Sequence, residues 1–262
     1  EYLAKKGERM VPHIEALLTD ENGRGTITKA AGPEVKIVEY DPEGETKVIA
    51  GMLFSSPQNH RSWNEILERI RKLGKEEKNR IVSDYLKGRT RRWQKVGRAF
   101  ENTYVRFEIV TNVGAWRDLH RHRMLTQQKQ NFSCYHGYDV PKEVSEAGLE
   151  EDFRTAIATA EDVFHKIAAH DPDLAQYAVT LAHRLRFMQW ENLRQSFWQI
   201  ELRTIPEGHP DYRHIEQEKF RLLKKIYPIL SEYMLVNLGE YDFARRGQEE
   251  KIQKKAQQLF RG

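Results

Sequence analysis

The sequence of residues 121–133 is RHRMLTQQKQNFS, in which a basic triplet precedes a run of neutral hydrogen-bonding side chains. Arg121 and Arg123 offer planar forks of donors that match phosphate oxygens, and His122 can donate or accept a hydrogen bond near neutral pH. The amides and hydroxyls that follow are able to recognise the polar edges of a heterocycle. The stretch therefore predicts a site for a phosphorylated ligand, although such a triplet taken alone is more typical of a solvated basic turn.

The residues before the triplet predict a strand followed by a helix. Residues 103–110 are rich in β-branched and aromatic side chains with partial alternation, which is typical of a strand. Residues 114–125 are predicted to be helical, which would place Arg117 and Arg121 one turn apart on the same face.

This order of elements resembles that of the flavin-dependent thymidylate synthases. The family carries a Phe-Glu-His element, then a strand, then a helix that ends in Arg-His-Arg, followed by seven residues and a serine. Here Phe100-Glu101 precedes the predicted strand, and Trp116-Arg117-Asp118-Leu119 precedes the triplet. The resemblance covers residues 34–220, with further matches at Asn192-Leu193-Arg194 and in residues 200–203.

The resemblance implies an α+β fold of the thymidylate synthase-complementing type, with a small antiparallel sheet and a large helical C-terminal half. Residues 34–40 are expected to form the opening strand and residues 48–53 to lie in the first helix. Apolar patterns predict further helices over residues 62–70, 75–86, 150–169 and 174–203. The last of these is apolar on several faces, and because family members are homotetramers, it is expected at a subunit contact.

The domain organisation follows from the same comparison. Residues 1–30 are predicted to be a helical tail and linker from a preceding domain, residues 31–240 the synthase-like domain, and residues 241–262 a polar C-terminal helix. Some family members carry two such domains in tandem, one of them diverged. We therefore expect either a preceding tandem domain or a homo-oligomer as the partner of this chain.

The resemblance also implies a reaction and its cofactors. In the family, reduced FAD delivers a hydride, methylenetetrahydrofolate supplies the carbon that converts dUMP to dTMP, and NADPH reduces the flavin again. The residues expected to contact FAD are Arg121, His122, Arg123, Asn192 and Asn102. The residues expected to contact dUMP or a related nucleotide are Arg203, Gln128, Gln130, Asn131, Ser133, Gln176, Arg117 and Arg213.

Four positions depart from the family pattern. Asn131 stands in place of the motif serine, Ser133 in place of an arginine that grips the nucleotide, Asn102 in place of a histidine, and Gln176 in place of a second arginine. Two of these exchanges remove a positive charge, and a charge-assisted hydrogen bond to phosphate is about twice as strong as a neutral one. The alternative is therefore a non-catalytic, diverged domain with a structural or oligomerisation role.

Composition limits the remaining classes. The net charge is only +4 with 31% charged residues, which argues against a histone-like or wholly nucleic-acid-coating protein. No apolar run is long enough for a membrane span and no signal peptide is visible, so a cytoplasmic location is predicted. The basic stretch between residues 69 and 98, with Arg89–Arg92 beside Trp93, leaves a nucleic-acid-binding module as a third and weaker alternative.

Cysteine and histidine usage argues against a metal site. Cys134 is the single cysteine, so neither an intrachain disulfide nor a multi-cysteine metal site can form. His209 and His214 are not at an established metal-ligand spacing. We expect Cys134 to be a small packing residue rather than a nucleophile.

Overall fold

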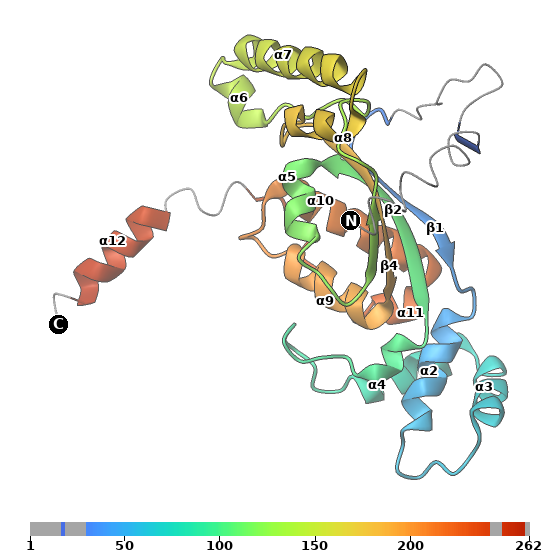
Figure 1. Cartoon of the computed structure of the whole chain (residues 1–262). Helices are drawn as coiled ribbons and strands as arrows, with labels where there is room; N and C mark the ends of the chain where they lie inside the picture. The colour runs from blue at the N-terminus through green and yellow to red at the C-terminus, as the bar shows by residue number, and fades with distance from the viewer. Residues whose placement is uncertain (1–16, 19–29, 242–247, 260–262) are drawn as a thin grey trace.

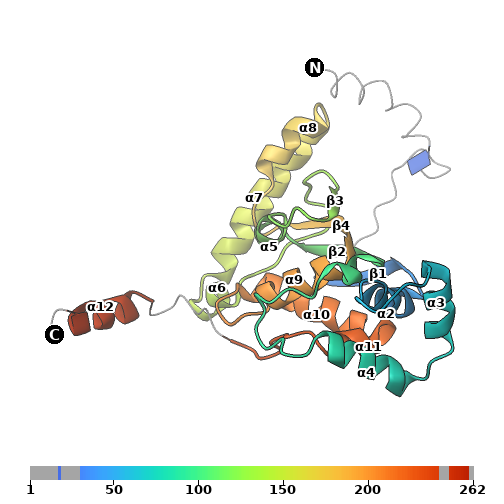
Figure 2. The ribbon, with the colours of Figure 1, turned by 90° about the horizontal axis from the view of Figure 1, so that it is seen from below.

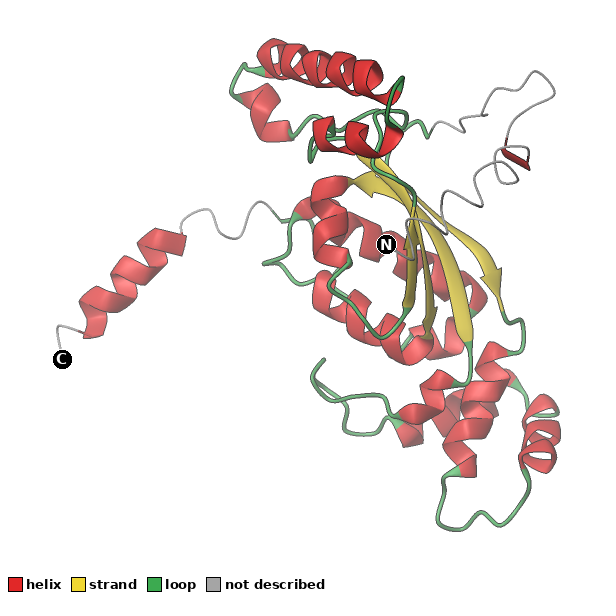
Figure 3. Cartoon of the chain, in the orientation of Figure 1, coloured by secondary structure: helices red, strands yellow, loops and turns green. Residues whose placement is uncertain are grey.

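The computed structural model describes residues 17–18, 30–241 and 248–259. An antiparallel sheet of four strands in the order β1-β2-β4-β3 lies among helices, which confirms the predicted α+β class (Figures 1 and 3). The strands are β1 (Glu34–Tyr40), β2 (Tyr104–Asn112), β3 (Thr126–Lys129) and β4 (Arg184–Asn192). The predicted tail over residues 1–30 lies almost wholly outside the described residues.

The two central strands pair along their whole lengths. Tyr104 lies opposite Asn192 at one end of the β2–β4 pair, and Asn112 lies opposite Arg184 at the other. β3 is an edge strand, paired with β4 so that Thr126 lies opposite Trp190 and Lys129 opposite Phe187. The basic triplet, which precedes β3, therefore lies near the end of the sheet at which β4 reaches Asn192.

Helices cover one face of this sheet, and two further groups of helices lie at its ends. α9, α10 and α11 form the covering layer, with α10 in contact with β1 and β2 (Figure 2). α2, α3 and α4 gather at one end of the sheet, and α6, α7 and α8 at the other (Figure 1). The α-helices are α2 (Gly44–Phe54), α3 (Trp63–Arg71), α4 (Lys75–Tyr85), α5 (Val113–Leu119), α6 (Lys142–Glu146), α7 (Glu150–Ala168), α8 (Pro172–Ala175), α9 (Leu193–Arg203), α10 (Pro210–Ile226), α11 (Pro228–Ser231) and α12 (Gln248–Leu259).

Several predicted elements are confirmed almost to the residue. β1 has the predicted bounds, and α7 ends one residue before the predicted end. α3 begins after Ser62, whose hydroxyl accepts a hydrogen bond from the Glu65 N–H, while the Ser62 N–H donates one to the Glu65 carboxylate. This reciprocal cap satisfies two amide groups that the first helical turn leaves without partners.

The prediction of one long helix over residues 174–203 is wrong. The segment contains α8, a short 3₁₀ helix (Gln176–Ala178), strand β4 and α9. In β4 the buried side chains alternate with more exposed ones, as a strand requires: Leu185, Phe187 and Gln189 point inward. The buried polar residues in this alternation hid the strand, because they break its apolar pattern.

The prediction of a helix over residues 114–125 is also partly wrong. α5 begins after Asn112, whose side-chain oxygen accepts a hydrogen bond from the Ala115 N–H at 2.8 Å, and it ends at Leu119. The chain then turns so that the ring of His122 is buried before β3 begins. Arg117 and Arg121 therefore do not share a helical face.

Candidate functional site

The centre of the basic triplet is anchored inside the protein. The ring of His122 is 8% exposed. Its Nε2 accepts a hydrogen bond from Nε of Arg203 at 2.9 Å, and its Nδ1 lies 3.3 Å from Nε2 of Gln195. The His122 carbonyl accepts a further bond from the Gln127 amide at 3.0 Å. These contacts hold the turn between α5 and β3 from three sides.

The arginines that flank His122 are in the opposite situation. Arg121 and Arg123 are exposed, and the described part of the chain provides neither with a hydrogen-bond acceptor or a carboxylate partner. Because the turn that carries them is anchored by His122, two guanidinium groups are presented on a fixed backbone. Such a pair suits an anion with several oxygens, such as a diphosphate.

The surroundings of His122 determine its charge. Burial, together with the positive charges of Arg203 and Lys219, lowers the pKa of His122 from 6.5 to about 3. The imidazole is therefore neutral at physiological pH, and this histidine supports the turn without adding a third positive charge to it.

The buried His122 should make folding stability depend on pH. Because its pKa is lower in the folded chain, the unfolded chain binds the extra proton, and the free energy of unfolding should fall as the pH drops from about 6.5 towards 3. The largest slope from one such group is about 1.4 kcal/mol per pH unit. Urea unfolding of His122→Gln should show a weaker loss than wild type across this window, with His60→Gln, at an exposed histidine, as the matched control. Equal slopes in all three proteins would contradict the expectation.

Two predicted flavin contacts lie at the same end of the sheet as the triplet. Asn192 ends β4, and its side-chain oxygen accepts a hydrogen bond from the Gln195 N–H at 2.9 Å, which caps α9. Asn102 is exposed just before β2 and donates to the Ala99 carbonyl at 2.8 Å. Because Asn192 lies opposite Tyr104, two residues after Asn102, the register of β2 with β4 brings the two asparagines to the same end of the sheet.

Three predicted nucleotide contacts lie beyond the other end of β3. The Gln176 side-chain oxygen accepts a hydrogen bond from the Phe132 N–H at 3.0 Å, and the Asn131 amide lies 3.4 Å from a carboxylate oxygen of Asp173. Gln176 thus fixes the backbone between Asn131 and Ser133. This contact uses the side-chain oxygen of Gln176 as an acceptor.

The remaining predicted contacts are spread over the fold. Gln128 and Gln130 are exposed along and just after β3, and Gln130 lies 3.0 Å from Nε2 of His136. Arg117 is exposed on α5, whereas Arg213 is buried and donates to the carbonyls of Pro206 and Tyr241. Within one chain, the predicted nucleotide residues do not converge on a single point.

A cluster of buried charged side chains lies between β4 and α10, and the sequence patterns did not predict it. Lys219 on α10 is fully buried, and its Nζ lies 3.0 Å from Glu191, 2.9 Å from the Gln189 oxygen and 3.6 Å from Glu216. Ser196 donates to Glu191 at 2.7 Å. Two carboxylates therefore share one ammonium, and burial raises the pKa of Glu216. The available signal was the alternation of β4, whose inward positions continue from Leu185 and Phe187 to Gln189 and Glu191.

The structure contains a cleft and a smaller pocket. The cleft has a volume of about 1210 Å³ and lies between α5 and α10 on one side and α6 and α7 on the other; its lining includes Asn112, Asp118, Asp211 and Arg213. The pocket, of about 320 Å³, is formed by the loop that follows α4.

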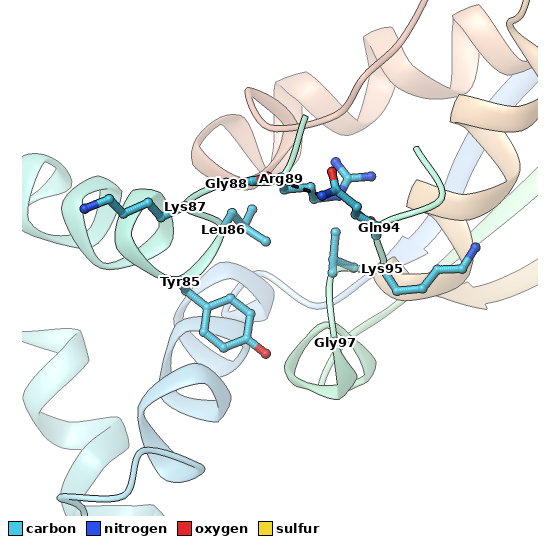
Figure 4. Close-up of a pocket in the computed structure, with 9 residues that line it drawn as sticks. Tyr85, Leu86, Lys87, Gly88, Arg89, Gln94, Lys95 and Gly97 are labelled. Atoms are coloured by element: carbon cyan, nitrogen blue, oxygen red, sulfur yellow. Dashed lines mark hydrogen bonds between the residues drawn. The ribbon is translucent and has the colours of Figure 1, made fainter. Parts of the chain in front are cut away.

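The basic loop around this smaller pocket is partly structural. Arg89 turns inward and pairs with Glu201, while Figure 4 shows Lys87 and Lys95 pointing away from the pocket on opposite sides. Lys95 lies over the ring of Trp198. The cations of this loop thus do not converge on one anion, which weakens the nucleic-acid alternative.

Two further features bear on the class of protein. Burial raises the pKa of Cys134 to about 12, which does not suit a thiolate nucleophile. Within the described ranges, no group of three or more histidine, cysteine or acidic side chains is placed to bind a metal, and no helix has the length and apolarity needed to cross a membrane.

Comparison with known proteins identifies the family. The family model described as Thymidylate synthase complementing protein matches residues 36–229. A UPF0159 protein of Chlamydia pneumoniae is 34% identical over 221 residues, which are 84% of this chain and 41% of the relative. A UPF0159 protein of Thermoplasma acidophilum is 32% identical over 221 residues, 82% of this chain and 44% of the relative. The chain belongs to the thymidylate synthase complementing protein family.

A solved structure confirms the fold. The UMP/dUMP methylase PolB from Streptomyces cacaoi, bound with 5-Br UMP, superposes with a TM-score of 0.61 over 79% of this chain and 95% of that chain, at 12% identity. The same methylase bound with 5-Br dUMP gives a TM-score of 0.60. The chain spans about two fifths of the length of the relatives from Chlamydia and Thermoplasma.

Proposed function

We propose that this chain is a flavin-dependent thymidylate synthase-like domain that methylates dUMP to dTMP. The observation that carries the proposal is the pair of exposed arginines, Arg121 and Arg123, on either side of the anchored His122. The family and the fold shared with a UMP/dUMP methylase support the same class of reaction.

The residues present fit an anionic dinucleotide cofactor. Arg121 and Arg123 would hold the diphosphate of FAD, and Asn102 and Asn192 lie at the same end of the sheet with amide groups suited to a flavin or ribose edge. FAD, when bound and reduced, supplies the hydride, while methylenetetrahydrofolate supplies the carbon and NADPH restores the reduced flavin. The protein's own share is to bind and orient these molecules.

The nucleotide site is proposed to need more than one copy of the chain. The predicted contacts on one side lie on or just after the edge strand β3: Gln128, Gln130, Asn131 and Ser133. Arg203 lies on α9 and Arg213 on α10, and both are already hydrogen-bonded within the chain. Family members build their active sites from several subunits, so a homotetramer would bring separated residues together. We propose such an assembly, in the cytoplasm, for the active form.

A second candidate is a non-catalytic domain that completes an assembly. The observation that favours it is that neutral side chains replace two arginines of the family pattern, and that Gln176, one of the replacements, is used to fix the backbone at Phe132. Such a domain would fold and assemble without turning over dUMP.

The test begins with flavin retention. The purified chain should show bound flavin by its visible absorption after FAD is added and free flavin is removed, and Arg123→Ala should lose it, because a charge-assisted contact to the diphosphate disappears. Arg80→Ala changes an exposed arginine on α4 and is the matched control. Flavin occupancy that is unchanged in Arg123→Ala would remove the basis of the proposal.

A dUMP-dependent turnover assay then separates the two candidates. Formation of dTMP with methylenetetrahydrofolate and NADPH would support the synthase-like enzyme. A folded chain that takes up no flavin and forms no dTMP would favour the non-catalytic domain.

A further inference from the structure

A chain of hydrogen bonds joins the buried ammonium of Lys219 to the ring of His122. A lysine ammonium only donates, so the Gln189 atom that lies 2.9 Å from it must be the amide oxygen. That oxygen also faces the Gln199 side chain at 3.1 Å, so Gln199 must present its NH₂ group there, and the same NH₂ donates to Glu216 at 2.6 Å. The Lys219 ammonium therefore determines that Gln189 accepts with its oxygen and that Gln199 donates with its NH₂ group.

The orientations of Gln199 and Gln195 determine which group faces His122. With its NH₂ group used, Gln199 offers its oxygen to Gln195, whose NH₂ group donates to it at 3.2 Å. The second hydrogen of that NH₂ group points to Nδ1 of His122, 3.3 Å away. In this arrangement the Gln189 NH₂ group has no partner in the described part of the structure, and the orientations that start from Lys219 present a donor to Nδ1 of His122.

The other ring nitrogen, Nε2, also faces a hydrogen-bond donor. Nε of Arg203 lies 2.9 Å from Nε2 of His122, and arginine has no acceptor. A neutral imidazole accepts at one nitrogen and donates at the other, so it cannot accept from both neighbours. Either Gln195 or Arg203 must therefore lose its hydrogen bond to the ring, because the nitrogen that it faces carries the ring hydrogen.

Burial decides which contact gives way. Gln195 is 6% exposed, so turning it away from the ring would leave two buried donors, its own N–H and the ring N–H, without acceptors, which is unfavourable. Arg203 is only half-buried and keeps its bond to the Asp118 carbonyl at 2.6 Å and its place over the Tyr212 ring. It can therefore turn its Nε towards solvent or a ligand.

The same turn contains a buried acceptor that is not hydrogen-bonded to any described residue. The side-chain oxygen of Gln127 is buried and has no hydrogen-bond partner in the described part of the structure, while its NH₂ group donates to the His122 carbonyl.

We propose that Lys219, acting through Gln189, Gln199 and Gln195, holds His122 in the tautomer that carries its proton on Nε2 and so frees the Nε–H of Arg203 to bind an oxygen of the ligand. Lys219 and the glutamines are positioning residues in this scheme, since none of them needs to touch the ligand. Only the last step, the use of Arg203 by the ligand, rests on the proposed function.

Nitrogen NMR of the full chain labelled with ¹⁵N-histidine reads the tautomer directly, and the loss of one signal set in His122→Gln assigns it. The wild-type ring should carry its proton on Nε2. Gln195→Met removes the donor at Nδ1 with little change in volume, so the proton should move to Nδ1 and the Arg203 Nε–H should exchange more slowly with solvent. Gln217 lies on α10, is as buried as Gln195 and donates to the Asn237 carbonyl, away from His122. Gln217→Met should therefore leave the tautomer unchanged.

Two results would overturn the inference: a wild-type ring that carries its proton on Nδ1, or a tautomer that Gln195→Met does not change. Neither readout needs flavin or nucleotide. A chain that binds no FAD yet shows the predicted tautomer change would reject the proposed function and keep the assignment of His122.

Discussion

Replacing Lys219 with Met is expected to lower the free energy of unfolding by about 3–5 kcal/mol, because it leaves buried carboxylates without their cation. Lys219, Glu191 and Glu216 are all fully buried. Both carboxylate oxygens of Glu191 lie 3.0 Å from the ammonium, and Oε1 also accepts a hydrogen bond from Ser196. Urea unfolding measures the change as a shift in the midpoint at an unchanged slope.

Lys225→Met is the matched control for this prediction. Lys225 lies on the same helix, α10, but is exposed, so its replacement should change stability little. The double variant Lys219→Met/Glu191→Leu should recover part of the loss, because it removes the carboxylate that depends most on the ammonium. A loss for Lys219→Met no larger than that for Lys225→Met would show that the three charges do not depend on one another.

Arg89→Met is expected to cost a similar amount, again about 3–5 kcal/mol. The Arg89 side chain is 7% exposed and that of Glu201 1%, with 2.5 Å between Nη2 and the carboxylate. Arg89 also donates to the carbonyls of Gln94 and Tyr233, at 2.8 and 3.0 Å. Its loss would leave a buried carboxylate and two carbonyls with fewer donors, and would detach the loop after α4 from the C-terminal segment.

The control for this second prediction lies two residues away. Arg91 belongs to the same basic stretch but is exposed, so Arg91→Met should leave the unfolding midpoint near that of wild type. Similar midpoints for Arg89→Met and Arg91→Met would instead indicate that the stretch as a whole is a solvated surface.

The parts of the fold that were predictable carry their signal locally. β1 is marked by β-branched residues, and α3 is marked by Ser62 and Glu65, whose cap needs no distant partner. β4 was missed because its polarity pattern inverts half-way along: Gln189 is buried on the inner face while Trp190 is 37% exposed on the outer one. Gln189 faces inward because Lys219 and Gln199, far away in the sequence, supply its partners.

The candidate site shows the same division. The motif located the turn around His122, since the triplet is contiguous in sequence. It did not show that His122 would be buried against Gln195 and Arg203, because that contact depends on how β4 and α9 pack against the turn. The distance between the predicted flavin contacts and the predicted nucleotide contacts likewise depends on the register of β3 with β4, which no short motif specifies.

The positions that depart from the family pattern all lie near the surface. Asn102 and Asn131 are exposed, and Ser133 and Gln176 are half-buried, whereas the ion cluster around Lys219 is sealed inside. A substitution at one of the outer positions removes at most two side-chain hydrogen bonds, such as the one that Gln176 accepts from the Phe132 N–H, but a single substitution in the cluster leaves a buried charge or amide without a partner. The positions that depart from the family pattern can thus change with little effect on stability, while the core can change only by several coordinated substitutions.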